Sequence, residues 1–210
     1  MLDALTHVDA PHALFGGLLA EYYGRRRETS DVDMLVPRSA FEPLKAIFKQ
    51  RGYAVREFPF LLKIVPRGQR EPVGDLVVAE SNAVIRTAFA LRIPAEIFGM
   101  RVSIVPRGAF VALKFEAAVR SKRQWKDRVI DLHDIRNVLH RHFTQQDELL
   151  ATALAQNMFP GAATQLESVL NDLRMGKWPR VMIRAEMRAG LLRRQGAAAM
   201  RRAGLFRGSS

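Results

Sequence analysis

The sequence contains no cysteine among its 210 residues. This absence excludes disulfide bonds and metal sites built from thiolate ligands. Long apolar runs are also absent, since no segment approaches the roughly 20 consecutive apolar residues of a membrane-spanning helix. The first residues, Met1-Leu2-Asp3, lack the basic and apolar character of a secretion signal. We therefore expect a cytoplasmic protein with no membrane partner.

Acidic side chains are scarce in the second half of the chain. Residues 1–100 carry 13 Lys and Arg against 12 Asp and Glu, whereas residues 101–210 carry 20 against 9. The basic excess is greatest from Arg174 to Ser210, where Glu186 is the single acidic residue. A concentrated basic segment favours a polyanionic partner such as RNA. An arginine-rich composition without any nucleic-acid role is the alternative.

The hydrophobic content of 48% allows the chain to bury a core, and its length suits one large domain or two small ones. The first part alternates short apolar runs with turns, as strands and short helices do. From Gly108 onward the apolar spacing is helical. We therefore predict an α+β fold, with a mixed sheet and flanking helices in residues 1–106 and a basic helical domain in residues 107–210.

Two aspartates, Asp31 and Asp33, stand at the start of the apolar run Met34-Leu35-Val36. Side chains two residues apart on a strand project to the same face, so these carboxylates would lie side by side. Adjacent carboxylates repel each other unless a cation neutralises them, and an all-oxygen ligand set suits Mg²⁺ or Mn²⁺. We predict that this pair binds a metal ion, rather than simply facing solvent.

The paired glycines Gly16-Gly17 precede this strand. In a turn, the backbone N–H groups of glycines can approach phosphate oxygens closely. A phosphate-binding turn beside metal-binding carboxylates is typical of enzymes that catalyse phosphoryl or nucleotidyl transfer.

The pattern Gly-Gly followed by Asp-x-Asp on a strand resembles the nucleotidyltransferase superfamily that includes DNA polymerase beta. The segment Arg27-x-Thr29-x-Asp31-x-Asp33 is similar to the AbiEii-type branch, which includes the MenT-type toxins of bacterial toxin–antitoxin pairs. Two later blocks are similar to the same branch: residues 112–117, which contain Lys114, and residues 131–135. The resemblance therefore spans most of the first two thirds of the chain.

This resemblance implies a polymerase beta-like fold and a role for each matching residue. Asp31 and Asp33 would be metal ligands, and Asp75 is the candidate for a third carboxylate on a later strand. Lys114 would neutralise the triphosphate or protonate the leaving pyrophosphate. Asp131 is the best match for the acidic partner of this lysine, and Asp134 is the alternative. The residues expected to contact a nucleoside triphosphate are Gly16, Gly17, Arg27, Thr29 and Lys114.

The function that follows is Mg²⁺-dependent transfer of an NMP from an NTP to an acceptor hydroxyl. The basic second half favours the 3′ end of tRNA as acceptor, and the resemblance implies a toxin that a cognate antitoxin neutralises. Three alternatives stay open: modification of a partner protein, modification of a small molecule such as an aminoglycoside, and an RNA-binding module with a vestigial site. The charge distribution opposes the small-molecule alternative, and the intact aspartate pair opposes the vestigial one.

Overall fold

The computed structural model describes residues 1–24, 29, 31–120 and 123–179. The chain divides into two compact units, Met1–Leu166 and Glu167–Ser210. The change from sheet to helices that we expected near residue 107 is observed, but it lies inside the first unit. Most of the basic segment that begins at Arg174 lies outside the described residues.

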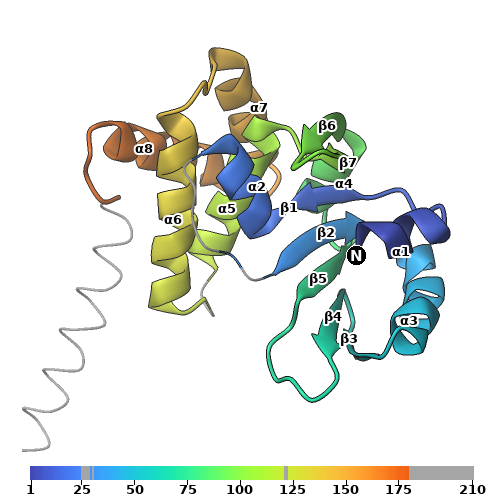
Figure 1. Ribbon diagram of the computed structural model, residues 1–210. Coiled ribbons are helices and arrows are strands. Elements are labelled where there is room, and N and C mark those ends of the chain that lie inside the picture. Colours follow the sequence, from blue (N-terminus) through green and yellow to red (C-terminus); the bar gives the residue numbers. More distant parts are fainter. Residues whose placement is uncertain (25–28, 30, 121–122, 180–210) are drawn as a thin grey trace, which may run out of the picture. The chain divides into compact units, whose positions relative to one another are not determined.

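A seven-stranded mixed sheet organises the first unit (Figure 1). Its strands are β1 (Ala13–Phe15), β2 (Val32–Val36), β3 (Tyr53–Phe58), β4 (Leu61–Pro66), β5 (Gly74–Val78), β6 (Ile93–Ile97) and β7 (Met100–Ile104). Their spatial order is β3-β4-β5-β2-β1-β7-β6. β2 is parallel to β5 and β1 is parallel to β7, whereas the other neighbours are antiparallel. The predicted α+β fold with a mixed sheet is thereby confirmed.

Helices alternate with the strands along the chain and then follow them. They are α1 (Leu2–His7), α2 (Gly16–Tyr23), the 3₁₀ helix η1 (Arg38–Ala40), α3 (Phe41–Gln50), α4 (Ala83–Ala90), α5 (Arg107–Val119), α6 (Trp125–Leu139), α7 (Gln145–Ala155) and α8 (Ala162–Arg174). Helix α7 begins with a capping box formed by Thr144 and Asp147. Helix α5 packs on both α6 and α7, closely enough that a Cβ at Gly108 would overlap the backbone of Asp147. Within the described residues, every helix is too short or too polar to cross a bilayer.

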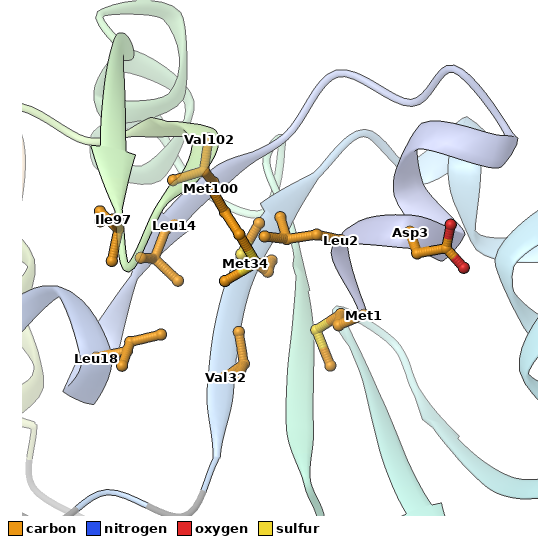
Figure 2. A pocket seen from close by; sticks show the side chains of 10 residues that line it. All are labelled: Met1, Leu2, Asp3, Leu14, Leu18, Val32, Met34, Ile97, Met100 and Val102. Carbon is orange, nitrogen blue, oxygen red and sulfur yellow. The ribbon is translucent and has the colours of Figure 1, made fainter.

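The central strand β2 separates two different environments. Its residues Met34, Leu35 and Val36 are fully buried. Because side chains alternate along a strand, Val32 and Met34 project to one face and Asp33 to the other. On the first face, apolar side chains line a cavity of about 260 Å³ (Figure 2). Asp33 therefore points to the opposite face, which helix α5 partly covers.

Candidate active site

Strand register places two of the predicted carboxylates together. Asp33 in β2 is paired with Asp75 in the parallel strand β5, and with Phe15 in the antiparallel strand β1. Residues paired across neighbouring strands project to the same face of a sheet. The structure therefore brings Asp75, the candidate third carboxylate, beside Asp33.

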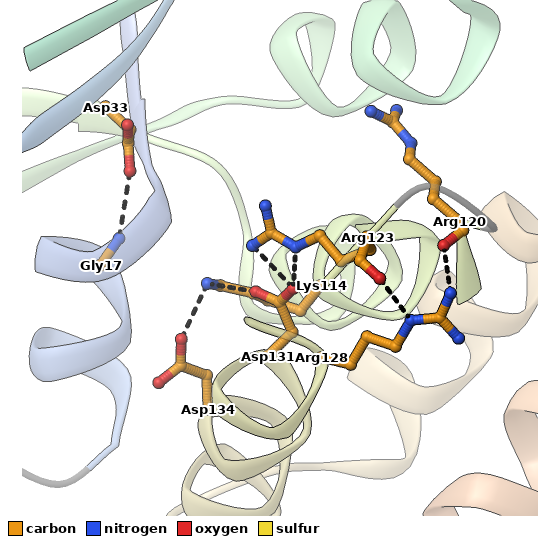
Figure 3. Close-up of polar contacts among 8 residues, drawn as sticks. All are labelled: Gly17, Asp33, Lys114, Arg120, Arg123, Arg128, Asp131 and Asp134. Atoms are coloured by element: carbon orange, nitrogen blue, oxygen red, sulfur yellow. Dashed lines mark hydrogen bonds and ion pairs between the residues drawn. The ribbon is translucent and has the colours of Figure 1, made fainter. Parts of the chain in front are cut away.

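The turn Gly16-Gly17 lies against the carboxylate of Asp33 (Figure 3). Gly16 has a φ of +70°, a left-handed conformation that glycine adopts without strain. A Cβ at this position would overlap the Asp33 carboxylate. The backbone N–H of Gly17 donates to Asp33 Oδ2 at 3.4 Å. The missing side chain of Gly16 thus allows the backbone at the start of α2 to approach the carboxylate.

Negative charge accumulates around Asp33. Burial raises the pKa of Asp33 from 3.8 to about 6, and repulsion from the Asp31 and Asp75 carboxylates contributes to the rise. The Gly17 N–H and the Lys114 ammonium lower this pKa but do not compensate. Asp33 is therefore repelled by both other carboxylates, and a cation beside Asp33 would relieve this repulsion.

Asp31 precedes β2, which begins at Val32. Its Oδ1 atom accepts a hydrogen bond from the hydroxyl of Thr29 at 2.9 Å. Thr29, which we predicted to contact the nucleotide, thus contacts one of the predicted metal ligands. Arg27, predicted for the same role, lies outside the described residues.

A lysine that sequence reasoning missed contacts the candidate third carboxylate. The Nζ atom of Lys63 lies 2.9 Å from Asp75 Oδ2 and 3.4 Å from its Oδ1. The two residues are directly opposite each other in the antiparallel β4–β5 pair. No local motif marks Lys63, because only the strand register brings it to the site.

Lys114 on α5 is held between two aspartates of α6 (Figure 3). Its Nζ atom lies 3.0 Å from Asp131 Oδ1 and 2.7 Å from Asp134 Oδ2. Both aspartates are almost fully buried, and an Nη2 atom of Arg123 lies 2.9 Å from Asp131 Oδ2. Two cations thus compensate two buried carboxylates, which offsets part of their desolvation cost. The partner of Lys114, left open between Asp131 and Asp134 in the sequence, proves to be both.

These groups meet in a cleft of about 320 Å³ between the sheet and α5. Its charged lining residues are Asp33, Asp75, Lys114, Arg120, Arg123 and Asp131. Its apolar lining residues are Phe15, Leu61, Val77, Phe110, Leu113 and Ala117. Two of these charged residues, Arg120 and Arg123, are held by Arg128, which donates to the backbone carbonyl of Arg120 at 2.7 Å and to that of Arg123 at 3.0 Å (Figure 3). A cleft with charged and apolar parts suits a ligand that combines phosphates with a flat apolar ring.

No protein-family model matches the chain, and no curated protein is similar to it in sequence. The solution structure of the antibiotic-resistance factor ANT(2'')-Ia has 19% identity and a TM-score of 0.51, over 74% of this chain and 87% of that one. The crystal structure of ANT(2'')-Ia in complex with adenylyl-2''-tobramycin gives the same identity and TM-score, over 74% of this chain and 92% of that one. The chain has the nucleotidyltransferase fold. At 19% identity the likeness establishes the fold alone.

A nucleotidyltransferase-like protein from Paracoccidioides brasiliensis is also similar, with 17% identity and a TM-score of 0.47 over 80% of this chain and 88% of that one.

The carboxylates at the start of β2 fit a divalent cation. Among the described residues, no three His, Cys, Asp or Glu side chains surround a common metal position. Mg²⁺, however, usually takes only one or two protein carboxylates and completes its shell with water and substrate phosphates. Asp31 and Asp33 meet that requirement: burial first, and then repulsion from Asp31 and Asp75, raises the pKa of Asp33, and a bound cation would offset both effects. Asp75 is bound to Lys63, so its part in a metal site stays a prediction.

Proposed function

We propose that the protein is a Mg²⁺-dependent nucleotidyltransferase that transfers an NMP from an NTP to an acceptor hydroxyl. The observation that carries this proposal is the pairing of Asp33 with Asp75 beside the Gly16-Gly17 turn, in a cleft that Lys114 also lines. Clustered, partly buried carboxylates destabilise a fold when nothing neutralises them. A metal-bound nucleotide would explain why the chain retains this arrangement.

In the proposed reaction, the acceptor oxygen attacks the α-phosphorus, the bond to the α–β bridging oxygen breaks, and pyrophosphate leaves. Asp75 accepts the proton of the attacking hydroxyl. Lys114, held by Asp131, neutralises the triphosphate and the leaving pyrophosphate, while N–H groups of the Gly16-Gly17 turn contact phosphate oxygens. A divalent cation bound by the aspartate pair that begins β2 would stabilise the charge that develops on the phosphoryl group.

The proposed acceptor is the 3′ end of tRNA, and the proposed role is that of a toxin neutralised by a cognate antitoxin. Two features support this acceptor and role. Residues 101–210 carry 20 basic against 9 acidic side chains, which favours an RNA partner. The segments around Asp31, Lys114 and Asp131 are similar to the AbiEii and MenT branch. Addition of a nucleotide to the 3′ end would block aminoacylation and thereby stop growth.

Label transfer tests the proposed chemistry. The protein is incubated with each α-³²P-labelled NTP, Mg²⁺ and total tRNA, and label on tRNA is the expected result. Asp33→Asn should reduce transfer by about 10³-fold or more. The matched variant Glu71→Gln changes an exposed carboxylate of the β4–β5 loop and should transfer as the wild type does. A folded protein that labels neither RNA, protein nor small molecule would refute the proposal.

A second candidate is transfer to the hydroxyl of a small molecule such as an aminoglycoside. It is favoured by the likeness in fold to ANT(2'')-Ia, whose crystal structure contains adenylyl-2''-tobramycin. The net charge of +12 opposes a cationic substrate. Label on tobramycin but not on tRNA would favour this candidate, and label on lysate proteins would favour a protein-modifying enzyme. Retention of tRNA in a gel shift without any transfer would favour an RNA-binding module.

A further inference from the structure

We propose that the exposed face of the β3–β4 hairpin binds the single-stranded 3′ end of an RNA. This surface, the acceptor ledge, consists of Arg56, Phe58 and Lys63 on one face of the strands, together with Phe60 in the turn that joins them. The inference rests on the proposed function, because it gives the acceptor of that reaction a place on the protein. The ledge lies beyond Asp75 on the side away from Asp33.

The strand register aligns the ledge with the carboxylates. Arg56 in β3 is opposite Lys63 in β4, and Lys63 is opposite Asp75 in β5. Paired residues share one face of the sheet, so a single row continues from Asp33 through Asp75 to these two cations. With strands about 4.8 Å apart, the Arg56 backbone lies about 14 Å from that of Asp33. The row therefore leads from the proposed reaction centre to β3, the terminal strand of the sheet.

Two aromatic rings accompany the two cations. Phe58 is 47% exposed and is paired with Leu61, which lines the cleft. Phe60, in the turn between the strands, is 57% exposed. Neighbouring large apolar side chains in solvent indicate a surface that a partner covers. Bases of a single strand stack on such rings, and an exposed cation beside them, such as Arg56, can bind a backbone phosphate.

The hairpin turn is fixed by contacts on its other side. Arg38 Nη1 donates to the carbonyl of Pro59 at 2.8 Å, and its Nη2 atom lies 3.3 Å from Glu57 Oε1. Glu57 also pairs with Lys45 of α3 at 2.7 Å. Because Glu57 neighbours Arg56 along β3, its negative charge projects to the opposite face. The ledge thus presents cations and aromatic rings in a held geometry, which is complementary to a nucleic-acid strand.

Two matched double variants of the full chain test the ledge. Arg56→Ala/Phe58→Ala alters the ledge, and Arg101→Ala/Phe98→Ala alters an exposed arginine and a 68% exposed phenylalanine at the opposite edge of the sheet. Binding of a short fluorescein-labelled single-stranded RNA is followed by anisotropy. We expect about tenfold weaker binding for the ledge variant, and less than about twofold for the control. Arg56→Ala alone should reduce the slope of log Kd against log salt by about 0.7.

Cross-linking locates the RNA independently of affinity. Trypsin cuts after Arg56 and after Lys63, so both ledge aromatics leave in the peptide of residues 57–63. An RNA with 4-thiouridine at its penultimate position should cross-link to this peptide. Cross-links confined to other peptides, or equal loss of RNA binding in both double variants, would overturn the ledge.

Nucleotide binding and transfer separate this inference from the proposed function. A mant-labelled NTP should bind both double variants as tightly as the wild type. If the ledge variant alone loses RNA but the wild type transfers no label, the ledge stands and the proposed reaction fails. If the ledge variant labels tRNA as well as the wild type does, the reaction stands and the ledge is refuted.

Discussion

The ammonium of Lys63 lies 2.9 Å from Asp75 Oδ2, directly across the antiparallel β4–β5 ladder. This contact places a positive charge directly beside the candidate third carboxylate. The same charge would compete with any divalent ion that approaches Asp75. The two side chains are 33% and 18% exposed, so water screens the pair only in part.

Lys63→Met should bind Mn²⁺ more tightly than the wild type. A partly exposed ion pair contributes about 1 kcal/mol, and its removal should therefore strengthen metal binding about fivefold. Isothermal titration calorimetry measures the affinity. Lys45→Met is the matched control, because Lys45 pairs with Glu57 and Glu42 on the other face of the hairpin. Unchanged or weaker binding by Lys63→Met would show that the ammonium does not compete for Asp75.

Asp33→Asn should stabilise the metal-free protein at neutral pH. The pKa of Asp33 is about 6 in the folded state against 3.8 ordinarily, so the unfolded chain loses this proton first as the pH rises. The contribution of this group to stability is therefore present at low pH and is lost as the pH passes through this interval. The loss corresponds to about 3 kcal/mol at most.

Urea unfolding in EDTA measures this effect. The free energies of unfolding of the wild type and Asp33→Asn should agree near pH 4 and diverge up to about pH 6, in the window set by the pKa of Asp33. Glu71→Gln should follow the wild type throughout. A difference that is independent of pH would contradict the electrostatic explanation.

Gly16→Ala should disable the site more than it destabilises the fold. Gly16 and Gly52 both have positive φ, +70° and +85°, so alanine at either position costs about 1–2 kcal/mol of unfolding free energy. At Gly16 the new Cβ also meets Asp33, whereas nothing lies within 4 Å of a Cβ at Gly52. Nucleotide transfer should fall about 100-fold in Gly16→Ala and stay close to that of the wild type in Gly52→Ala. Equal transfer by the two variants would contradict the need for this close approach.

Lys114→Met should lower the free energy of unfolding by about 3–5 kcal/mol, because it removes the cation that two buried carboxylates share. Lys126→Met, at an exposed position of α6, should change it by about 0.5 kcal/mol or less. The double variant Lys114→Met/Asp134→Asn should recover part of the loss, since it also removes one of the two negative charges that face the lost ammonium. Urea denaturation midpoints decide, and a Lys114→Met midpoint equal to that of the wild type would contradict the prediction.

Most of the sheet, and the positions of Asp33 and Asp75 on it, could be predicted because the signals are local. Asp33 and Asp75 each stand at the start of a short apolar run that a turn precedes, and such runs identify strands. The strand β6 is harder to recognise, since Pro94 interrupts its pattern. Pro94 is tolerated there because β6 lies at the edge of the sheet, where proline's missing backbone N–H costs no hydrogen bond to a neighbouring strand.

Contacts that depend on tertiary packing could not be predicted. Lys63 reaches Asp75 only through the register of two strands separated by a loop. Asp131 and Asp134 share one face of a helix, so spacing could not choose between them. The structure uses both: Lys114 donates a hydrogen bond to Asp131 and forms an ion pair with Asp134. The role of the basic segment after Arg174 stays a prediction.

The row of side chains from Arg56 to Phe15 is assembled from four strand pairings and no shared motif. A single inserted residue within β4 or β5 would turn every later side chain of that strand to the other face. Lys63 or Asp75 would then be present in the chain yet missing from the site. Insertions between Arg67 and Val73, in contrast, leave the row intact. Among homologous chains, differences in length should therefore concentrate in that loop. Gaps in a sequence alignment, more than substitutions, should show which homologues have kept the site.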